Sequence, residues 1–158
     1  MTWSKFRDPC PTIDGLEQVA TSYAAGPGLD FAVLCDQISP ALTPTSLRIS
    51  SDGGTTFSPP ISLAKLPMDS QAIAMPAPGT IDVVAFNTDG PSVVETSTDS
   101  GATWHLTLEA ATGFVQGMVP QPWIGSQNGQ TGRVSFGIGS AVFVTTDGGA
   151  HWRPTPLS

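Results

Sequence analysis

The sequence predicts an all-β fold made of three four-stranded β-propeller blades. Three observations predict it: an octet that recurs three times at a nearly constant interval, short apolar runs between turn residues, and a composition rich in glycine and proline. The chain has 158 residues, of which 17 are glycine and 15 are proline, and 12% are charged. Many turn residues with few charges are typical of an all-β chain with short strands.

The recurring octets read SSDGGTTF, STDSGATW and TTDGGAHW, and they align without gaps. Their aspartates, Asp52, Asp99 and Asp147, are 47 and 48 residues apart, an interval that matches one four-stranded blade. We therefore predict one partial propeller over residues 1–158, with blades at 10–66, 67–112 and 113–158. Residues 1–9 are predicted as the outer strand of a preceding blade, and an unrelated N-terminal strand is the alternative.

Each octet is interpreted as a tight β-hairpin. The aspartate carboxylate accepts backbone N–H groups of its own turn, and the glycine two residues later tolerates a positive φ. The aromatic residue at the eighth position leaves the turn and packs between blades. The residues given these structural roles are Asp52, Gly54, Phe57, Asp99, Gly101, Trp104, Asp147, Gly149 and Trp152.

Strands are predicted on both sides of each octet. The innermost strands are placed at Gln18–Ser22, Gln71–Met75 and Gln116–Val119, and the second strands at Asp30–Ile38, Thr80–Asn87 and Arg133–Ile138. The third strands are placed at Ser46–Ser51, Ser92–Thr98 and Ala141–Thr145, and the outer strands at Thr56–Leu63, Thr103–Glu109 and His151–Pro156. The second strands of blades one and two are nearly continuous apolar runs, which indicates burial on both faces.

The octets resemble the Asp-box (BNR) repeats of sialidases, sortilin-type receptor propellers and photosystem II assembly factors. Two positions depart from that pattern, because Phe57 stands where tryptophan is usual and His151 where threonine or serine is usual. Sialidase propellers have six blades, so the resemblance implies half of a six-bladed propeller or a segment of a larger one. Since three blades cannot close a ring, we expect a two-fold dimer that completes six blades, or the remainder of a longer propeller.

Charge and composition exclude several partners. The formal net charge is −7, and the six Lys and Arg residues are scattered, so we expect no nucleic-acid partner. No apolar run is long enough for a membrane span. The N-terminus lacks the apolar core of a signal peptide, whereas the low charge favours a secreted or extracytoplasmic origin. Two histidines and two cysteines predict no metal site and no cofactor. Cys10 and Cys35 are interpreted as a disulfide or as two buried thiols.

Catalysis is not expected. The resemblance to sialidases implies an arginine triad, a Tyr–Glu pair and an aspartate, but no arginine triad is recognisable here. Tyr23, the single tyrosine, lies near Glu17 in the sequence and makes a Tyr–Glu pair conceivable. A sialidase-like glycoside hydrolase fragment therefore remains one alternative. A truncated repeat segment without independent function is another.

The expected function is that of a non-catalytic propeller module that binds a ligand, such as a carbohydrate, or a protein. The predicted site is the channel mouth, where the innermost strands begin with Gln18, Gln71 and Gln116 and are flanked by Glu17 and Tyr23. A glutamine amide both donates and accepts hydrogen bonds, which suits a neutral glycan. The alternative is that these amides bond to each other, to backbone or to water.

Overall fold

The computed structural model describes residues 8–10, 12, 17–37, 46–64, 66, 69–86, 91–110, 122–137 and 141–155. Within these ranges the regular elements are twelve strands, which form three four-stranded antiparallel sheets. The predicted all-β architecture of three four-stranded blades is thereby confirmed. Among the same residues, no helix has the length and hydrophobicity that crossing a bilayer requires.

Blade one is the sheet nearest the N-terminus. Its strands pair in chain order and are β1 (Gln18–Ala25), β2 (Phe31–Gln37), β3 (Ser46–Ser50) and β4 (Ile61–Ser62). The predicted second and third strands agree with β2 and β3 to within one residue at each end. The outer strand β4 is much shorter than the predicted strand, because residues 51–57 belong to the octet turn.

Blade two is the middle sheet and has the longest strands. It is formed by β5 (Asp69–Ala77), β6 (Thr80–Phe86), β7 (Ser92–Ser97) and β8 (His105–Ala110), again paired in chain order. All four overlap the predicted strands. Val83, Val84 and Ala85 of β6 are completely buried, as expected for the second strand of a blade with a neighbour on each side.

Blade three differs from the prediction at its innermost strand. Its strands are β9 (Trp123–Ser126), β10 (Gly132–Ser135), β11 (Val142–Thr145) and β12 (Arg153–Thr155). The predicted innermost strand at 116–119 lies outside the described residues, and β9 takes the place next to β10. The sequence feature that would have placed this strand is the turn dipeptide Asn128-Gly129. In the loop between β9 and β10, Asn128 Oδ1 accepts the Gln130 N–H at 2.8 Å.

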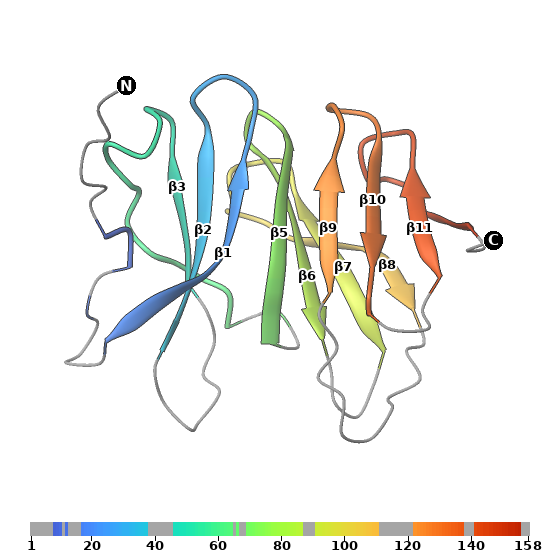
Figure 1. The fold of residues 1–158 in the computed structure, drawn as a ribbon, viewed down its shortest axis with the longest axis horizontal. Helices are drawn as coiled ribbons and strands as arrows, with labels where there is room; N and C mark the ends of the chain where they lie inside the picture. The colour runs from blue at the N-terminus through green and yellow to red at the C-terminus, as the bar shows by residue number, and fades with distance from the viewer. Residues whose placement is uncertain are drawn as a thin grey trace.

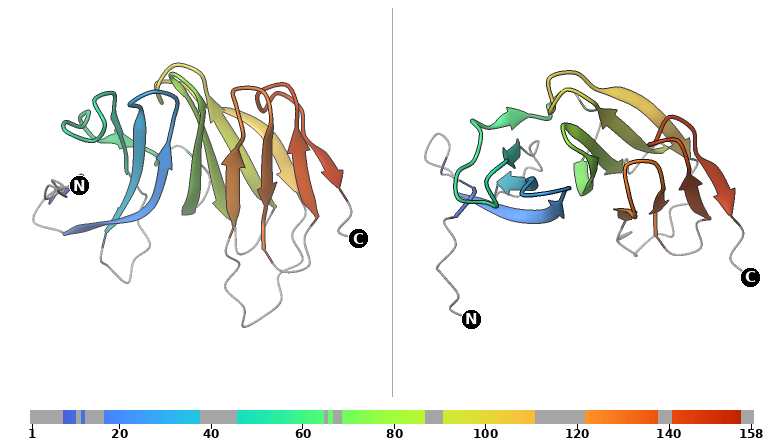
Figure 2. Two further views of the ribbon diagram at one scale, coloured as in Figure 1. Left: turned by 45° about the horizontal axis from the view of Figure 1, so that its top comes forward. Right: turned by 90° about the horizontal axis from the view of Figure 1, so that it is seen from above.

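The three sheets stand side by side in an arc (Figure 1). Seen from above, the first strands β1, β5 and β9 lie on one side of the arc, and the last strands β4, β8 and β12 lie on the other (Figure 2). The two outer blades contact the middle blade, and among the described residues each has one face without a neighbouring sheet. This order is that of propeller blades whose first strands line the centre.

Two apolar clusters form the joints between blades. The joint between blades one and two is made by Ala24, Ala32, Leu34, Leu47, Leu63, Leu66, Ile73, Met75, Ile81 and Val83. The joint between blades two and three is made by Ala72, Ala74, Val84, Val94, Ala110, Ile124, Val134 and Phe136. Trp104 packs against the first cluster and Trp152 against the second, both only partly buried. The aromatic residues of the second and third octets therefore pack against the preceding blade.

A third cluster covers part of the outward face of blade one. Cys10 and Cys35 form a disulfide, and both are buried together with Val33. Phe57 packs against this cluster on the face that would meet a preceding blade, so it occupies the same relative position as Trp104 and Trp152. The disulfide thus holds residues 8–10 against a face that lacks a neighbouring sheet.

The joints predict different costs for two tryptophan substitutions. Trp104→Ala removes an indole from the first joint and should destabilise the protein by about 3 kcal/mol. Trp123 is 54% exposed, so Trp123→Ala, the matched control, should change the free energy of unfolding by well under about 1 kcal/mol. Urea unfolding of both variants measures this. Equal destabilisation by the two would contradict the assignment of Trp104 to the joint.

Candidate functional site

The first octet turn is held by a hydroxyl and a carboxylate. Ser50 Oγ donates to Asp52 Oδ1 at 2.7 Å and accepts the Gly54 N–H at 2.8 Å. Asp52 Oδ1 accepts the Thr56 N–H at 2.9 Å, and Asp52 Oδ2 accepts the Thr56 hydroxyl at 2.7 Å. The carboxylate therefore closes the turn with both oxygens, and the serine hydroxyl joins it to the glycine.

The second turn repeats this network with the same partners in the same order. Ser97 Oγ donates to Asp99 Oδ1 at 2.8 Å and accepts the Gly101 N–H at 2.8 Å. Asp99 accepts the Thr103 N–H at 2.8 Å and the Thr103 hydroxyl at 2.6 Å. Ser50 and Ser97 are both buried, so each hydroxyl satisfies a glycine N–H that water does not reach.

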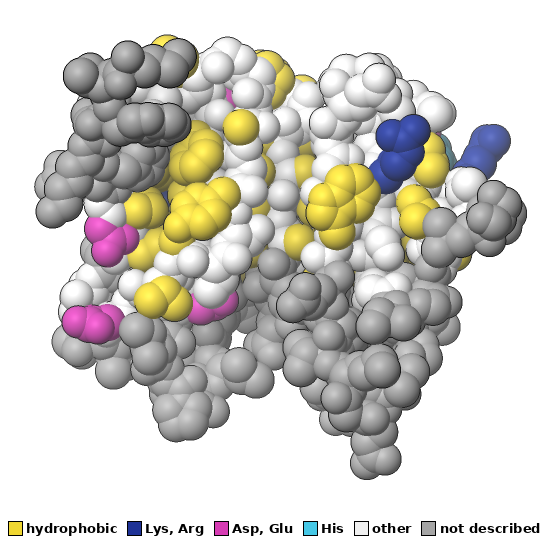
Figure 3. Space-filling model, viewed as in Figure 1, with side chains coloured by type: hydrophobic (Ala, Val, Ile, Leu, Met, Phe, Trp, Pro, Cys, Tyr) yellow, Lys and Arg dark blue, Asp and Glu magenta, His cyan; other side chains and the backbone are white. Residues whose placement is uncertain are grey.

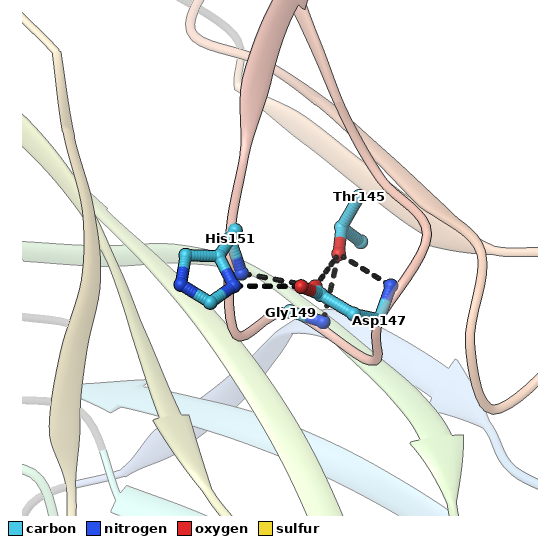
Figure 4. A network of polar contacts seen from close by, with 4 residues as sticks. All are labelled: Thr145, Asp147, Gly149 and His151. Atoms are coloured by element: carbon cyan, nitrogen blue, oxygen red, sulfur yellow. Dashed lines mark hydrogen bonds and ion pairs between the residues drawn. The ribbon is translucent and has the colours of Figure 1, made fainter.

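The third turn keeps the network although a histidine replaces the threonine (Figure 4). Thr145 Oγ1 donates to Asp147 Oδ1 at 2.8 Å and accepts the Gly149 N–H at 2.9 Å. Asp147 Oδ1 accepts the His151 N–H at 2.9 Å, and His151 Nδ1 lies 2.7 Å from Asp147 Oδ2. The imidazole nitrogen therefore takes the place of the threonine hydroxyl, so the substitution costs the turn no contact.

These hydrogen bonds lower the pKa of each turn aspartate from its ordinary value of 3.8 to about 2. The leading cause is the Thr56 N–H for the pKa of Asp52, the Thr103 hydroxyl for that of Asp99 and the His151 N–H for that of Asp147. Each bond favours the charged carboxylate. The aspartates act as acceptors within the turns, which is a structural role.

Each turn is also tied to the first hairpin of its own blade. The residue after the aspartate donates its N–H to a carbonyl of that hairpin: Gly53 to Leu29, Ser100 to Gly79, and Gly148 to Gln130, each at 2.9 Å. The loop between the first two strands and the octet turn therefore lie against each other at the same end of every blade. A turn that opened would release this loop as well.

The turn glycines press against the preceding blade. Gly101 has a φ of 86°, and a Cβ there would lie 3.3 Å from Ile61 Cδ1 and 3.4 Å from Leu47 Cδ2. Gly149 has a φ of 91°, and its Cβ would lie 3.5 Å from Asp82 Oδ1. A side chain at Gly101 would meet both backbone strain and a crowded joint. The octet turn is thus part of the joint between blades as well as a hairpin.

Asp82 is the charged group buried in the second joint. It is 2% exposed, and its Oδ1 accepts the Thr96 hydroxyl at 2.7 Å. Burial raises the pKa of Asp82 to about 6, and the bond from Thr96 offsets part of this effect. Trp152 Nε1 is buried without an acceptor among the described residues. The second joint is therefore more polar than the first, a feature that the sequence analysis did not identify.

Two of the predicted channel-mouth glutamines, Gln18 and Gln71, do not occupy one register position. Gln18 pairs with Gln37, is buried, and its Oε1 accepts the Ser46 hydroxyl at 3.3 Å. Gln71 falls at the irregularity in the pairing of β5 with β6, and the matching irregularity in β1 falls at Thr21. Gln116 lies outside the described residues. The expected equivalence of Gln18 and Gln71 was therefore wrong, because Gln71 lies at the β-bulge and Gln18 does not.

The other predicted residues of the channel mouth are on the surface. Glu17 is exposed at the start of β1, and Tyr23 is 56% exposed, with its ring 6.0 Å from that of Phe31. The described arginines lie in two different blades, with Arg48 on β3 of blade one and Arg133 and Arg153 on β10 and β12 of blade three. Arg48 Nε donates to the Ser58 carbonyl at 2.8 Å. Within the described ranges no group of three metal-ligating side chains is present.

Exposed apolar side chains gather on the first strands of the end blades. The large hydrophobic residues exposed in the described part of the chain are Val19, Tyr23, Leu29, Leu106 and Trp123. Val19 and Tyr23 lie on β1, and Trp123 lies on β9. Apolar groups over both end blades share one face of the molecule (Figure 3). Aromatic groups exposed in this way are typical of binding surfaces.

The comparisons with known proteins define the class of the fold. No protein-family model and no curated protein matches the chain. Among solved structures it is similar to YCF48 from Cyanidioschyzon merolae, with 15% identity, a TM-score of 0.55, and coverage of 88% of this chain and 37% of that one. It is also similar to YCF48 bound to D1 peptide, with 14% identity, a TM-score of 0.52, and coverage of 94% and 46%.

These likenesses show the β-propeller fold. The chain spans less than half of the length of either YCF48 chain, so it corresponds to a part of such a propeller. The octets and the blade order were predicted from the sequence alone, and the propeller neighbours agree with that architecture.

The turn aspartates predict acid sensitivity. Because the folded pKa of Asp99 lies below its ordinary value, its contribution to stability is present above about pH 4 and is lost as the pH falls towards 2. Asp99→Asn should lower the melting temperature at pH 7 and show a smaller further loss between pH 4 and 2 than the parent. Melting curves across this range measure it, with the exposed Glu109→Gln as control. An Asp99→Asn variant that melts like the control would contradict this role.

Asp82 predicts the opposite pH dependence. Its folded pKa, about 6, lies above the ordinary 3.8, so the native state binds more protons between these values and loses stability as the pH rises from 4 to 6. Asp82→Asn removes the buried charge and should stabilise the protein by up to roughly 3 kcal/mol at pH 7. Urea unfolding at pH 4 and pH 7 measures this. A variant that is destabilised equally at both values would show that the charge carries no penalty.

Proposed function

We propose that this chain is a non-catalytic propeller segment that binds a protein partner on the side where its first strands lie. The observation that supports the proposal is the exposure of Val19, Tyr23 and Trp123 on β1 and β9. Tyrosine and tryptophan supply large contact areas with few rotatable bonds and dominate the energetics of protein interfaces. Three exposed apolar groups over the two end blades offer anchors for one extended partner.

A protein partner is favoured over a glycan for two reasons. One of the similar propellers has a peptide ligand, namely YCF48 bound to D1 peptide. In addition, Gln18 is buried and its amide oxygen accepts the Ser46 hydroxyl, so that oxygen is already engaged within the blade. The proposal therefore replaces the neutral glycan with a peptide segment and retains the absence of catalysis.

The shared hydrogen-bond network of the octet turns also bears on which kind of propeller repeat they are. We infer that they are Asp boxes, since all three share one network of a hydroxyl, a carboxylate and a glycine N–H. The ring-closing dimer expected from the sequence is retained as the competing use of the two end blades. It would use the outward faces of blades one and three, and the molar mass in solution tests it.

The function is tested by selecting peptides from a random display library against the purified chain and measuring their dissociation constants. Trp123→Ala and Tyr23→Ala should each weaken binding of the selected peptides by about tenfold or more. Leu106→Ala is the matched control, because Leu106 is equally exposed but lies on the outer strand β8. Binding to this control should equal that of the parent.

Two further measurements test the alternative functions, which are glycan binding and sialidase-like hydrolysis. A glycan panel and a set of chromogenic glycosides, sialosides included, should give neither binding nor hydrolysis. Hydrolysis of any glycoside, abolished by Tyr23→Phe, would favour the sialidase-like alternative. Failure of every library to yield a specific peptide would refute the proposed function.

A further inference from the structure

The outward face of blade three, which we call the open face, carries an unusual set of side chains. Ile124, Val134 and Phe143 pack towards blade two. Since successive residues of a strand point to opposite faces, their neighbours point outward. The open face includes Trp123, Gly125, Arg133, Val142, Val144 and Arg153.

The pairing register arranges these residues in rows. Gly125 pairs with Arg133, Arg133 with Val144, and Val144 with Arg153. Directly paired residues share a face of an antiparallel sheet. The two arginines therefore lie two strands apart in one row, with a valine between them, and both are exposed.

The equivalent faces of the other two blades are different. In the register of Arg133 and Val144, blade one has Ala32 and Ile49, and blade two has Asp82 and Thr96. These positions are covered by the next blade. The register position of Trp123 is held by Ser22 in blade one and by Ala72 in blade two, where small side chains allow the sheets to approach. A tryptophan and two arginines make the open face unlike either internal joint.

Trp123 is placed on this face by its own strand. A Cβ at Gly125 would lie 2.7 Å from Trp123 Cζ2, so the indole lies over the glycine and no other residue would fit beneath it. Gly125 pairs with Arg133. The exposed indole and the first guanidinium are thus neighbours, and Arg and Trp are the residue types most enriched at binding hot spots.

The charge of this face is opposite to that of the protein. The chain has a net charge of −7, whereas the described charged residues of blade three are Arg133, Arg153 and Asp147, besides His151. Blade one contributes one described arginine, Arg48, against the carboxylates Glu17, Asp30, Asp36 and Asp52. In Figure 3, cationic side chains lie over the blade-three end of this face and acidic side chains lie over the opposite half. This asymmetry favours an acidic ligand at the open face.

We propose that the open face binds an acidic peptide segment of a partner protein, in an extended polyproline II conformation across β9 to β12. This inference rests on the proposed protein-binding function and names the chemistry of the partner. Neighbouring strands lie about 4.8 Å apart, so the backbones of Arg133 and Arg153 are about 10 Å apart. A polyproline II peptide rises about 3.1 Å per residue with three residues per turn, so acids at i and i+3 face one side with matching spacing. An apolar side chain one or two residues further on reaches Trp123.

The test uses a fluorescein-labelled peptide Glu-Pro-Pro-Glu-Pro-Leu and its isomer Pro-Glu-Glu-Pro-Pro-Leu, which has the same composition but adjacent acids. Fluorescence anisotropy with the full chain should give binding of the first peptide that is about tenfold tighter than that of the isomer. Raising the salt should weaken it, because screening reduces exposed charge interactions. Arg133→Ala, Arg153→Ala and Trp123→Ala should each weaken binding by about tenfold, and Leu106→Ala should not.

Charge reversal keeps the proposal testable if an alanine variant folds poorly. Arg133→Glu combined with Arg153→Glu should bind Lys-Pro-Pro-Lys-Pro-Leu in preference to the acidic peptide. Equal binding of the acidic peptide and its isomer, no binding at all, or insensitivity to the arginine variants would overturn the inference.

The competing occupant is a second copy of the chain. If light scattering gives a dimer that Val144→Glu converts to a monomer while Leu106→Glu does not, the open face is a contact between copies and the inference is overturned. Failure here is distinguishable from failure of the proposed function. Library peptides that bind through Tyr23 but carry no acids, and that ignore Arg133, would leave the function standing and remove this inference alone.

Discussion

The fold depends on one hydrogen-bonded pair that recurs in each blade, a buried hydroxyl that donates to an aspartate carboxylate. Ser50, Ser97 and Thr145 are each the last residue of a third strand, and each hydroxyl also accepts a glycine N–H. Without the hydroxyl, that N–H would be buried and unpaired, at a cost of about 1–3 kcal/mol. The pair therefore fixes where the strand ends and how the turn closes. Since the turn is tied to the first hairpin and carries the aromatic residue of the joint, it links the local geometry of one strand to the packing of two sheets.

The two joints show that the same turn geometry tolerates different chemistry. Gly101 rests on Leu47 and Ile61, whereas Gly149 rests on Asp82 and Thr96. In the first joint the close approach of the sheets buries apolar surface, which is favourable by about 25 cal/mol per Å². In the second joint it also buries a carboxyl group, whose raised pKa records the cost of desolvation. The turns and their glycines therefore set how closely neighbouring sheets approach. The residues that these glycines contact in the preceding blade determine how much each joint stabilises the fold.

The sequence predicted those parts of the fold whose signals are local. The octets mark the end of each third strand, and the apolar runs at residues 31–35 and 81–85 mark second strands, so these elements were located to within a residue or two. The innermost strands were less predictable, because their bulges at Thr21 and Gln71 shift the register without a sequence signature. The alignment of Gln18 with Gln71 failed for that reason. In blade three the short strand β9 has one apolar position facing the core, Ile124, and the adjacent Asn128-Gly129 turn was the available signal. Burial of Asp82 depends on residues of another blade, so the local sequence around Asp82 could not predict it.

The open face of blade three differs from the second joint in the kind of charge that it carries. Asp82 can enter a joint because a carboxyl group becomes neutral when its pKa rises. An arginine has no such option, since a guanidinium keeps its charge at any pH at which proteins fold. A sheet that covered Arg133 and Arg153 with apolar side chains would therefore leave two uncompensated charges, which typically costs several kcal/mol for each. The neighbouring indole adds a volume that the small residues of the internal joints do not have. Whatever covers this face must supply hydrogen-bond acceptors, and carboxylates are the acceptors that match guanidinium groups in both charge and geometry.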